Sequence, residues 1–290
     1  MAEKRDDFDN PWKSILEKYF QEFMVFFFPE IHDDINWAQG HDFMDQELQQ
    51  IVRDADLSKR YVDKLVKVWK LNGSERLVFV HIEIQSQEDS DFSSRMFVYN
   101  YRIRDCYDAK IVSLAILGDD RSNWRPEPFR DELWGCEVTF RFPMVKLLDY
   151  EPRWLELEAS RNPFAIAVMA HLKTKETQKD PQSRKEWKFQ LTRRLYEQGF
   201  ERQDIMELFL FVDWMMELPE GLKREFKTEL EQYEQEKQMR YVSSIEEIGI
   251  QRGKQEIVLV MLAKGLSVEE IASLTDIPIE KVRELQSQQR

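Results

Sequence analysis

The chain has 290 residues, of which 33% are charged, 42% are hydrophobic and 12% are aromatic, and its formal net charge is −13. This apolar and aromatic content excludes a disordered protein, and the acidic charge excludes a protein that coats nucleic acid through bulk electrostatics. A polyanionic substrate would need a local basic groove or a divalent cation. Cys106 and Cys136 are too few for a disulfide framework and are not spaced as zinc ligands, so both are expected to be reduced.

The N-terminal sequence MAEKRDDFDN lacks the continuous apolar core of a secretory signal. The most apolar early run, residues 23–29, is much shorter than the ~20 residues that a membrane-spanning helix needs. We therefore expect a cytoplasmic protein without membrane association.

Residues 11–28 have apolar positions at helical spacing. Asn10 is a suitable N-cap, Pro11 occupies the first helical position, and Pro29 ends the segment. Residues 42–51 (DFMDQELQQI) predict a second helix.

The following segment alternates between strand and helix patterns. Strands are predicted over residues 61–71 and 76–86 around the turn signal Asn72-Gly73, a helix over 92–105, and strands over 110–118 and 137–147, the last with a break at Pro143. Beyond residue 150, helical patterns dominate, over residues 163–173, 182–198, 201–217 and 219–239.

These patterns predict an α/β fold in which a mixed sheet flanked by helices precedes an all-helical C-terminal half. The expected domain boundaries are 1–150 for the α/β core, 151–240 for a helical extension packed on it, and 241–290 for a helical tail. The tail sequence GLSVEEIASLTDIPIEKV resembles a helix-turn-helix, with Ser267 and Glu270 forming a capping box. The segment expected to form its third helix begins without the hydrogen-bond donors that a DNA-reading helix needs, so an oligomerisation element fits equally well.

The hairpin places two carboxylates opposite each other. With the turn centred near Gly73, opposed residues have numbers that sum to about 146, so Asp63 faces Glu83. Odd-numbered positions put Asp63, His81, Glu83 and Gln85 on one face. Directly opposed like charges are destabilising unless a cation lies between them, and carboxylate oxygens suit Mg²⁺ or Mn²⁺. The competing interpretations are that a basic neighbour such as Arg60 or Lys67 neutralises the pair, or that the register differs.

Asp63 followed by Glu83-Ile84-Gln85 resembles the PD-(D/E)xK nuclease signature with glutamine in place of lysine. The runs RYVD, EIQSQ and SSRMFVYNYRIRD narrow the resemblance to the recombination-promoting nuclease (Rpn, YhgA-like) family, which is described as transposase-like. The similarity is strong over the first half, loose over the helical middle, and returns in the tail sequence.

The resemblance implies a restriction-endonuclease-like core and metal-dependent hydrolysis of phosphodiester bonds in DNA. It implies that Asp63 and Glu83 bind a divalent cation, most simply Mg²⁺ with Mn²⁺ as an alternative, and that Gln85 occupies the position of the catalytic lysine. Glu47 matches a further acidic ligand more weakly. Because glutamine cannot supply a positive charge, two interpretations remain: slow catalysis with help from another cation, or a catalytically degenerate DNA- or protein-binding module that acts through its helical tail.

Arg95 and Tyr99 lie four residues apart and share one face of a predicted helix, from which both could reach the hairpin as substrate contacts. A solvated helix edge is the alternative. Residues 121–130 (RSNWRPEPFR) combine basic and aromatic side chains that can contact phosphates and bases, although the acidic residues Glu127 and Asp131 favour a plain surface loop. The expected partner is DNA, and the C-terminal helices are candidates for homo-oligomerisation.

Overall fold

The computed structural model describes residues 11–44, 62–71, 77–239, 241–242, 261–262, 268 and 271. Two compact units are present, one comprising residues 1–200 with 207–222 and the other residues 201–206 with 223–290. The predicted tail, residues 241–290, lies almost entirely outside the described residues, and Glu47 is also outside them.

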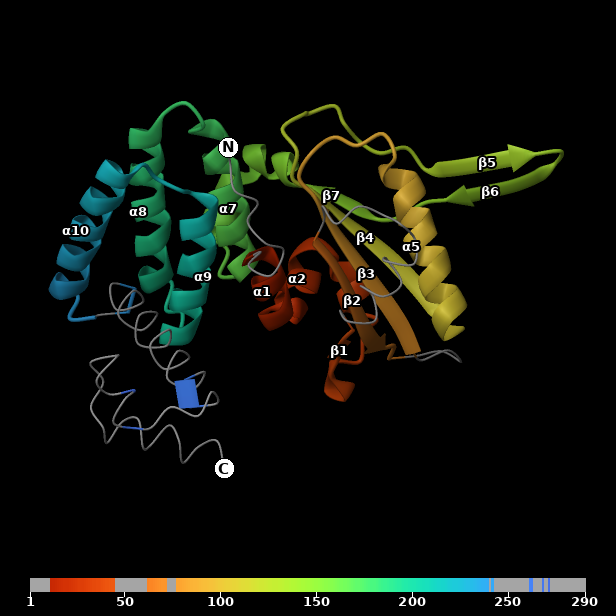
Figure 1. The fold of residues 1–290 in the computed structure, drawn as a ribbon, viewed down its shortest axis with the longest axis horizontal. Coiled ribbons are helices and arrows are strands. Elements are labelled where there is room, and N and C mark those ends of the chain that lie inside the picture. The colour runs from red at the N-terminus through yellow and green to blue at the C-terminus, as the bar shows by residue number, and fades with distance from the viewer. Residues whose placement is uncertain are drawn as a thin grey trace. The chain divides into compact units, whose positions relative to one another are not determined.

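A mixed five-stranded sheet forms the centre of the first unit (Figure 1). Antiparallel pairing joins β1 to β2 and β2 to β3, whereas β3, β4 and β7 are parallel neighbours. The sheet order is β1-β2-β3-β4-β7, with bounds Asp42–Phe43, Val62–Trp69, Leu77–Gln85, Lys110–Leu117 and Met144–Lys146. Of the strand predicted over residues 137–147, only Met144–Lys146, after the break at Pro143, belongs to this sheet, and residues 136–140 pair in a separate two-stranded sheet.

The register of the β2–β3 hairpin is the predicted one. Asp63 pairs with Glu83 and Leu65 pairs with His81, so the opposed residue numbers sum to 146. The described odd-numbered side chains of the hairpin face helix α5, Phe92–Tyr107, where Leu65, Phe79 and Ile103 share one apolar cluster. In this way the sheet places the polar end of β3 beside the first turns of α5.

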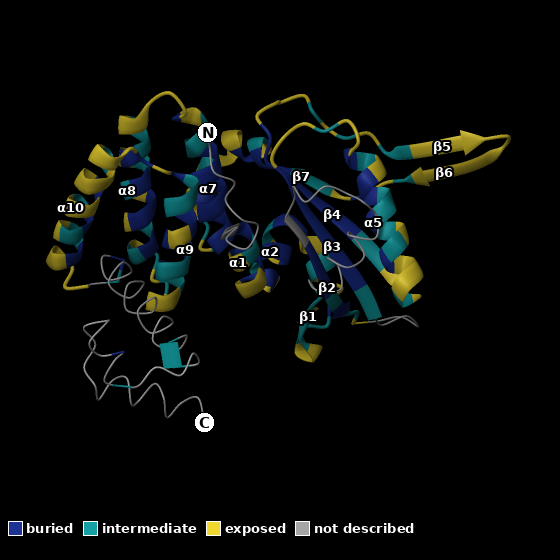
Figure 2. Cartoon of the chain, viewed as in Figure 1, coloured by how far each residue is buried: buried dark blue, intermediate teal, exposed yellow. Residues whose placement is uncertain are grey.

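The even-numbered face is covered by N-terminal helices. Lys64, only 1% exposed, forms an ion pair with Glu17 of α1, Pro11–Lys18. The sequence pattern predicted one helix over residues 11–28, but the chain has a turn at Tyr19 and continues as α2, Phe20–Phe27. Because both faces are covered, β3 is buried from Phe79 to Gln85 (Figure 2).

The prediction of a helix over residues 42–51 is wrong at its start. Asp42 and Phe43 form β1, which pairs with Lys67 and Val66 of β2. This pairing satisfies backbone groups on the otherwise open edge of β2, and such long-range hydrogen bonding overrides local helix propensity. Residues 45–51 lie outside the described part of the chain.

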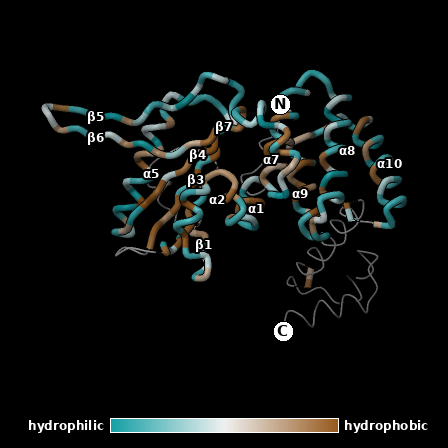
Figure 3. Tube along the Cα trace, turned by 180° about the vertical axis from the view of Figure 1, so that it is seen from behind, coloured by the Kyte–Doolittle hydropathy of each residue, from teal (hydrophilic) through white to brown (hydrophobic). Residues whose placement is uncertain are grey.

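A two-stranded hairpin, β5 (Phe129–Leu133) and β6 (Cys136–Phe140), extends away from the central sheet (Figure 1). Its strands are mostly hydrophilic, in contrast to the apolar central strands (Figure 3). The turn residues Trp134 and Gly135 have φ of 52° and 84°, which is the geometry of a type I′ turn. The sequence predicted a surface loop over residues 121–130 and a strand over 137–147, so β5 and its pairing with β6 were not predicted.

Helical structure follows β7, as predicted. The α7 helix, Pro163–Glu176, is buried from Pro163 to Leu172, and Phe164 contacts Phe23 of α2 at 5.2 Å between ring centroids. The other described helices after β7 are the 3₁₀ segment η3 (Leu147–Arg153), α6 (Trp154–Ala159), α8 (Pro181–Glu197), α9 (Arg202–Met215) and α10 (Glu220–Glu236). Before the sheet, α3 (Pro29–His32) and the 3₁₀ segment η2 (Trp37–Gln39) follow α2. An α/β core followed by a helical half is thus confirmed.

Candidate active site

The candidate site lies at the carboxyl end of β3, where the strand is completely buried. Glu83 is 0% exposed and Gln85 is 1% exposed, and both point toward the first turns of α5. The backbone of Asp63 is directly opposite that of Glu83 on β2. The Asp63 side chain itself lies outside the described part of the structure.

Arg95 joins the polar groups of this region. Its Nη2 donates hydrogen bonds to Glu83 Oε1 at 3.1 Å and to Gln85 Oε1 at 2.9 Å, while its Nη1 forms an ion pair with Asp89. The guanidinium also lies 5.2 Å from the centroid of the Phe92 ring, and the residue is only 8% exposed. We refer to Glu83, Gln85, Asp89 and Arg95 as the acidic site. The basic neighbour of Glu83 is therefore Arg95 on α5, whereas the sequence suggested Arg60 or Lys67.

Both polar ends of the Gln85 side chain have partners. Its Oε1 accepts from Arg95, and its Nε2 donates to the carbonyl oxygen of Gln87 at 2.6 Å. These two bonds fix the orientation of the amide, since the oxygen must face the guanidinium and the nitrogen must face the carbonyl. One Nε2 hydrogen is left for a further acceptor.

The second oxygen of Glu83 is in a different situation. Oε2 is buried and has no hydrogen-bond partner among the described residues; His81 Nε2 is 3.8 Å away, beyond hydrogen-bond distance. Burial, assisted by the charge of Arg95, lowers the pKa of His81 to about 3. The imidazole is therefore neutral at pH 7 and does not compensate the charge of Glu83.

His81 is held by structural contacts. Its Nδ1 lies 3.4 Å from Ser113 Oγ on β4, and Asn100 of α5 donates to the same hydroxyl at 3.1 Å. The ring packs edge-on against Tyr99, with 5.3 Å between centroids. These contacts give His81 a structural role between β3, β4 and α5.

The donor set is compatible with a hard divalent cation. Glu83 has a buried oxygen without a partner among the described residues, and carboxylate oxygens are the ligands that Mg²⁺ and Mn²⁺ prefer. Within the described ranges, no three His, Cys, Asp or Glu side chains are grouped as a metal site. The two further predicted ligands, the Asp63 side chain and Glu47, fall outside those ranges.

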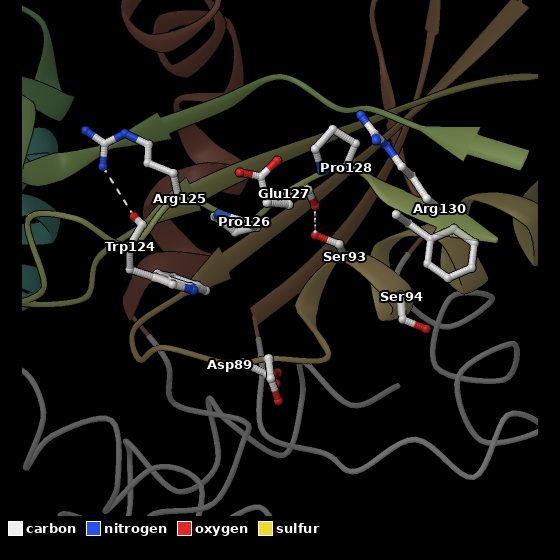
Figure 4. A pocket seen from close by; sticks show the side chains of 11 residues that line it. Asp89, Ser93, Ser94, Trp124, Arg125, Pro126, Glu127, Pro128 and Arg130 are labelled. Atoms are coloured by element: carbon white, nitrogen blue, oxygen red, sulfur yellow. Dashed lines mark hydrogen bonds between the residues drawn. The ribbon is translucent and has the colours of Figure 1, made fainter. Parts of the chain in front are cut away.

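A groove of about 440 Å³ borders the acidic site (Figure 4). It lies between the start of α5 and the loop before β5, and Asp89 belongs both to its wall and to the acidic site. The loop contributes Trp124 and Arg125, and the start of β5 contributes Phe129 and Arg130; these are basic and aromatic residues noted in the sequence. Glu127 is also in the lining, and Arg125 is engaged with Asp149 at 2.7 Å.

Tyr99, predicted with Arg95 as a substrate contact, is 1% exposed and belongs to the apolar cluster between β2, β3 and α5. Substrate contact by these two residues stays a prediction. A second buried polar group was missed from sequence: Asp119, directly after β4, is bound by Lys146 of β7. Its only sequence signal was the Gly-Asp-Asp that follows a buried strand.

None of the described helices has the length and apolarity required to cross a membrane. Comparison of the chain with known protein families, with curated proteins and with solved structures finds no match.

Proposed function

We propose that this chain is a metal-dependent DNA endonuclease of the PD-(D/E)xK type, similar to the recombination-promoting nucleases. The observation that carries the proposal is the register of the hairpin. It places Asp63 opposite Glu83, with Gln85 two residues further along β3, and Glu83 has a buried oxygen without a partner among the described residues. The mixed sheet and the helix α5 supply the scaffold that such a nuclease requires.

In this proposal Asp63 and Glu83 would be the residues that hold a divalent cation. When bound, such a cation lowers the pKa of a water molecule and offsets the charge that develops on the scissile phosphate. The remaining Nε2 hydrogen of Gln85 is available to orient that water or a phosphate oxygen, because its other hydrogen is already donated to Gln87. In this proposal a DNA strand would approach the site through the groove whose lining includes Asp89.

The ion pair between Arg95 and Glu83 favours a second candidate function, a catalytically silent DNA- or protein-binding module. A carboxylate that already has an arginine partner does not require a metal for charge balance. In that case Asp63 and Glu83 would have a structural role only.

Nicking of supercoiled plasmid distinguishes the two functions. We expect nicking that depends on Mg²⁺ or Mn²⁺ and is abolished by EDTA, and we expect Asp63→Asn and Glu83→Gln each to reduce its rate by at least about 100-fold. Asp105→Asn, the same change at an exposed position of α5, is the matched control. Nicking without metal, or nicking that survives both site substitutions, would exclude the nuclease assignment.

A further inference from the structure

The nuclease motif alone does not provide a positively charged side chain at the acidic site. Glu83 and Asp89 are acids, Asp63 lies across the ladder, and residue 85 is a neutral glutamine. A glutamine can orient a reactant through hydrogen bonds but cannot stabilise negative charge as a lysine does. A fixed cation from elsewhere in the chain would supply the positive charge that residue 85 lacks.

Arg95 places such a cation at the end of the residue 85 side chain. Its Nη2 is 2.9 Å from Gln85 Oε1, so the guanidinium lies next to the position that the amino group of a lysine at 85 would occupy. Arginine keeps its charge even when it is buried. Contacts with Phe92, Asp89 and Glu83 hold the group in one orientation.

We propose that Arg95, contributed by helix α5, is the positioning residue that gives the Glu-x-Gln site its fixed positive charge. The inference rests on the proposed nuclease function. Arg95 acts through Glu83 and Gln85: it occupies one oxygen of Glu83 and leaves the other for the cation, and it fixes the amide of Gln85.

Substitution of Arg95 should affect metal binding differently from substitution of an arginine whose role is purely structural. The guanidinium and a metal ion share Glu83, and because both are positive, each weakens the binding of the other. Removal of the Arg95 charge should therefore tighten metal binding while it slows the reaction. A structural arginine should instead cause metal binding and activity to be lost together, along with stability.

The experiment compares Arg95→Gln with wild type by two readouts: Mn²⁺ affinity from the electron paramagnetic resonance of free Mn²⁺, and plasmid nicking. We expect Arg95→Gln to bind Mn²⁺ about tenfold more tightly. We also expect its kcat to fall about 100- to 1000-fold while KM for DNA changes less than about threefold. Arg104→Gln removes the same charge from an exposed position of α5 and is expected to behave as wild type in both readouts.

Relocation of the charge gives the most specific test. In the double variant Gln85→Lys/Arg95→Gln the motif lysine returns, and we expect at least about tenfold of the lost kcat to return with it. Circular dichroism and thermal unfolding verify the fold of each variant. If Arg95→Gln does not fold, the double variant alone decides, and nicking at background level by a folded double variant overturns the inference.

Failure of the inference and failure of the proposed function are distinguishable. If wild type nicks DNA and Arg95→Gln nicks equally well, or binds Mn²⁺ no more tightly, the role of Arg95 is refuted and the nuclease stands. If wild type binds no Mn²⁺ and does not nick DNA, the nuclease assignment falls and the inference falls with it.

Discussion

Lys146 donates hydrogen bonds to both carboxylate oxygens of Asp119, at 2.9 and 2.8 Å, and each residue is only 1% exposed. The same ammonium donates to the carbonyl oxygen of Trp124 at 3.0 Å. The three bonds join the ends of β4 and β7 to the loop that lines the groove beside the acidic site. The ion pair therefore holds the groove wall against the sheet.

Lys146→Met should destabilise the fold by about 3–5 kcal/mol, because it leaves the Asp119 carboxylate buried without its cation. The double variant Asp119→Leu/Lys146→Met should cost clearly less than the sum of the two single substitutions, since no unpaired charge remains. Urea denaturation of the three variants measures these differences. Additive costs would show that the two residues act independently.

His171 should make stability depend on pH. Its side chain lies on α7 against Gly118, and burial, together with the nearby Lys175, lowers its pKa to about 4. In the unfolded chain a histidine has a pKa of about 6.5, so between about pH 6.5 and pH 4 the unfolded state binds the proton more readily. Stability is thus expected to fall as the pH decreases through this window, by at most about 3 kcal/mol from this group.

The measurement is urea unfolding of wild type and His171→Gln between pH 7.5 and pH 4. Glutamine does not titrate, so the variant should show a shallower loss of stability, and the difference between the two curves isolates His171 from other titrating groups such as His81. Parallel curves would mean that His171 is protonated equally in both states.

The turn at the end of the β5–β6 hairpin gives a local prediction. Gly135 has φ of 84°, a conformation that is strained for a residue with Cβ, so Gly135→Ala should weaken the hairpin by about 1 kcal/mol or more. Trp134→Asn should strengthen it, because asparagine favours the first position of a type I′ turn. Hydrogen exchange of residues 129–140 measures both effects. Gly221→Ala is the control, since a Cβ at that helical position meets no atom within 4 Å and φ is not positive.

The register of the β2–β3 hairpin was predictable because two local signals agree, although both strands are shorter than predicted. Apolar alternation assigns each strand two faces, and the Asn72-Gly73 turn fixes which residues are opposed. A strand offset by one residue would have exchanged the buried and polar faces. The backbone pairing of Asp63 with Glu83 therefore followed from sequence alone.

Other features depend on residues that are distant in the chain. β1 exists because Asp42 and Phe43 satisfy the edge of β2, more than twenty residues later. The partner of Glu83 could not be assigned because Arg95 reaches it from a helix whose rotation about its own axis is set by packing on the sheet. Local patterns carry information on periodicity and turns, whereas partner choice depends on tertiary packing.

Arg130 provides a test of the groove as the DNA route. It is exposed at the groove rim, at the start of β5, so Arg130→Gln should remove one phosphate contact without disturbing the acidic site. We expect a few-fold weaker binding of a DNA duplex in Ca²⁺ and a salt dependence whose slope is smaller by about 1, with kcat in Mg²⁺ unchanged. Arg104→Gln, exposed on α5 outside the groove lining, is the matched control. If fluorescence anisotropy gives both variants the same affinity and slope, the DNA follows another surface, because a contact made by Arg130 must appear in the number of released counterions.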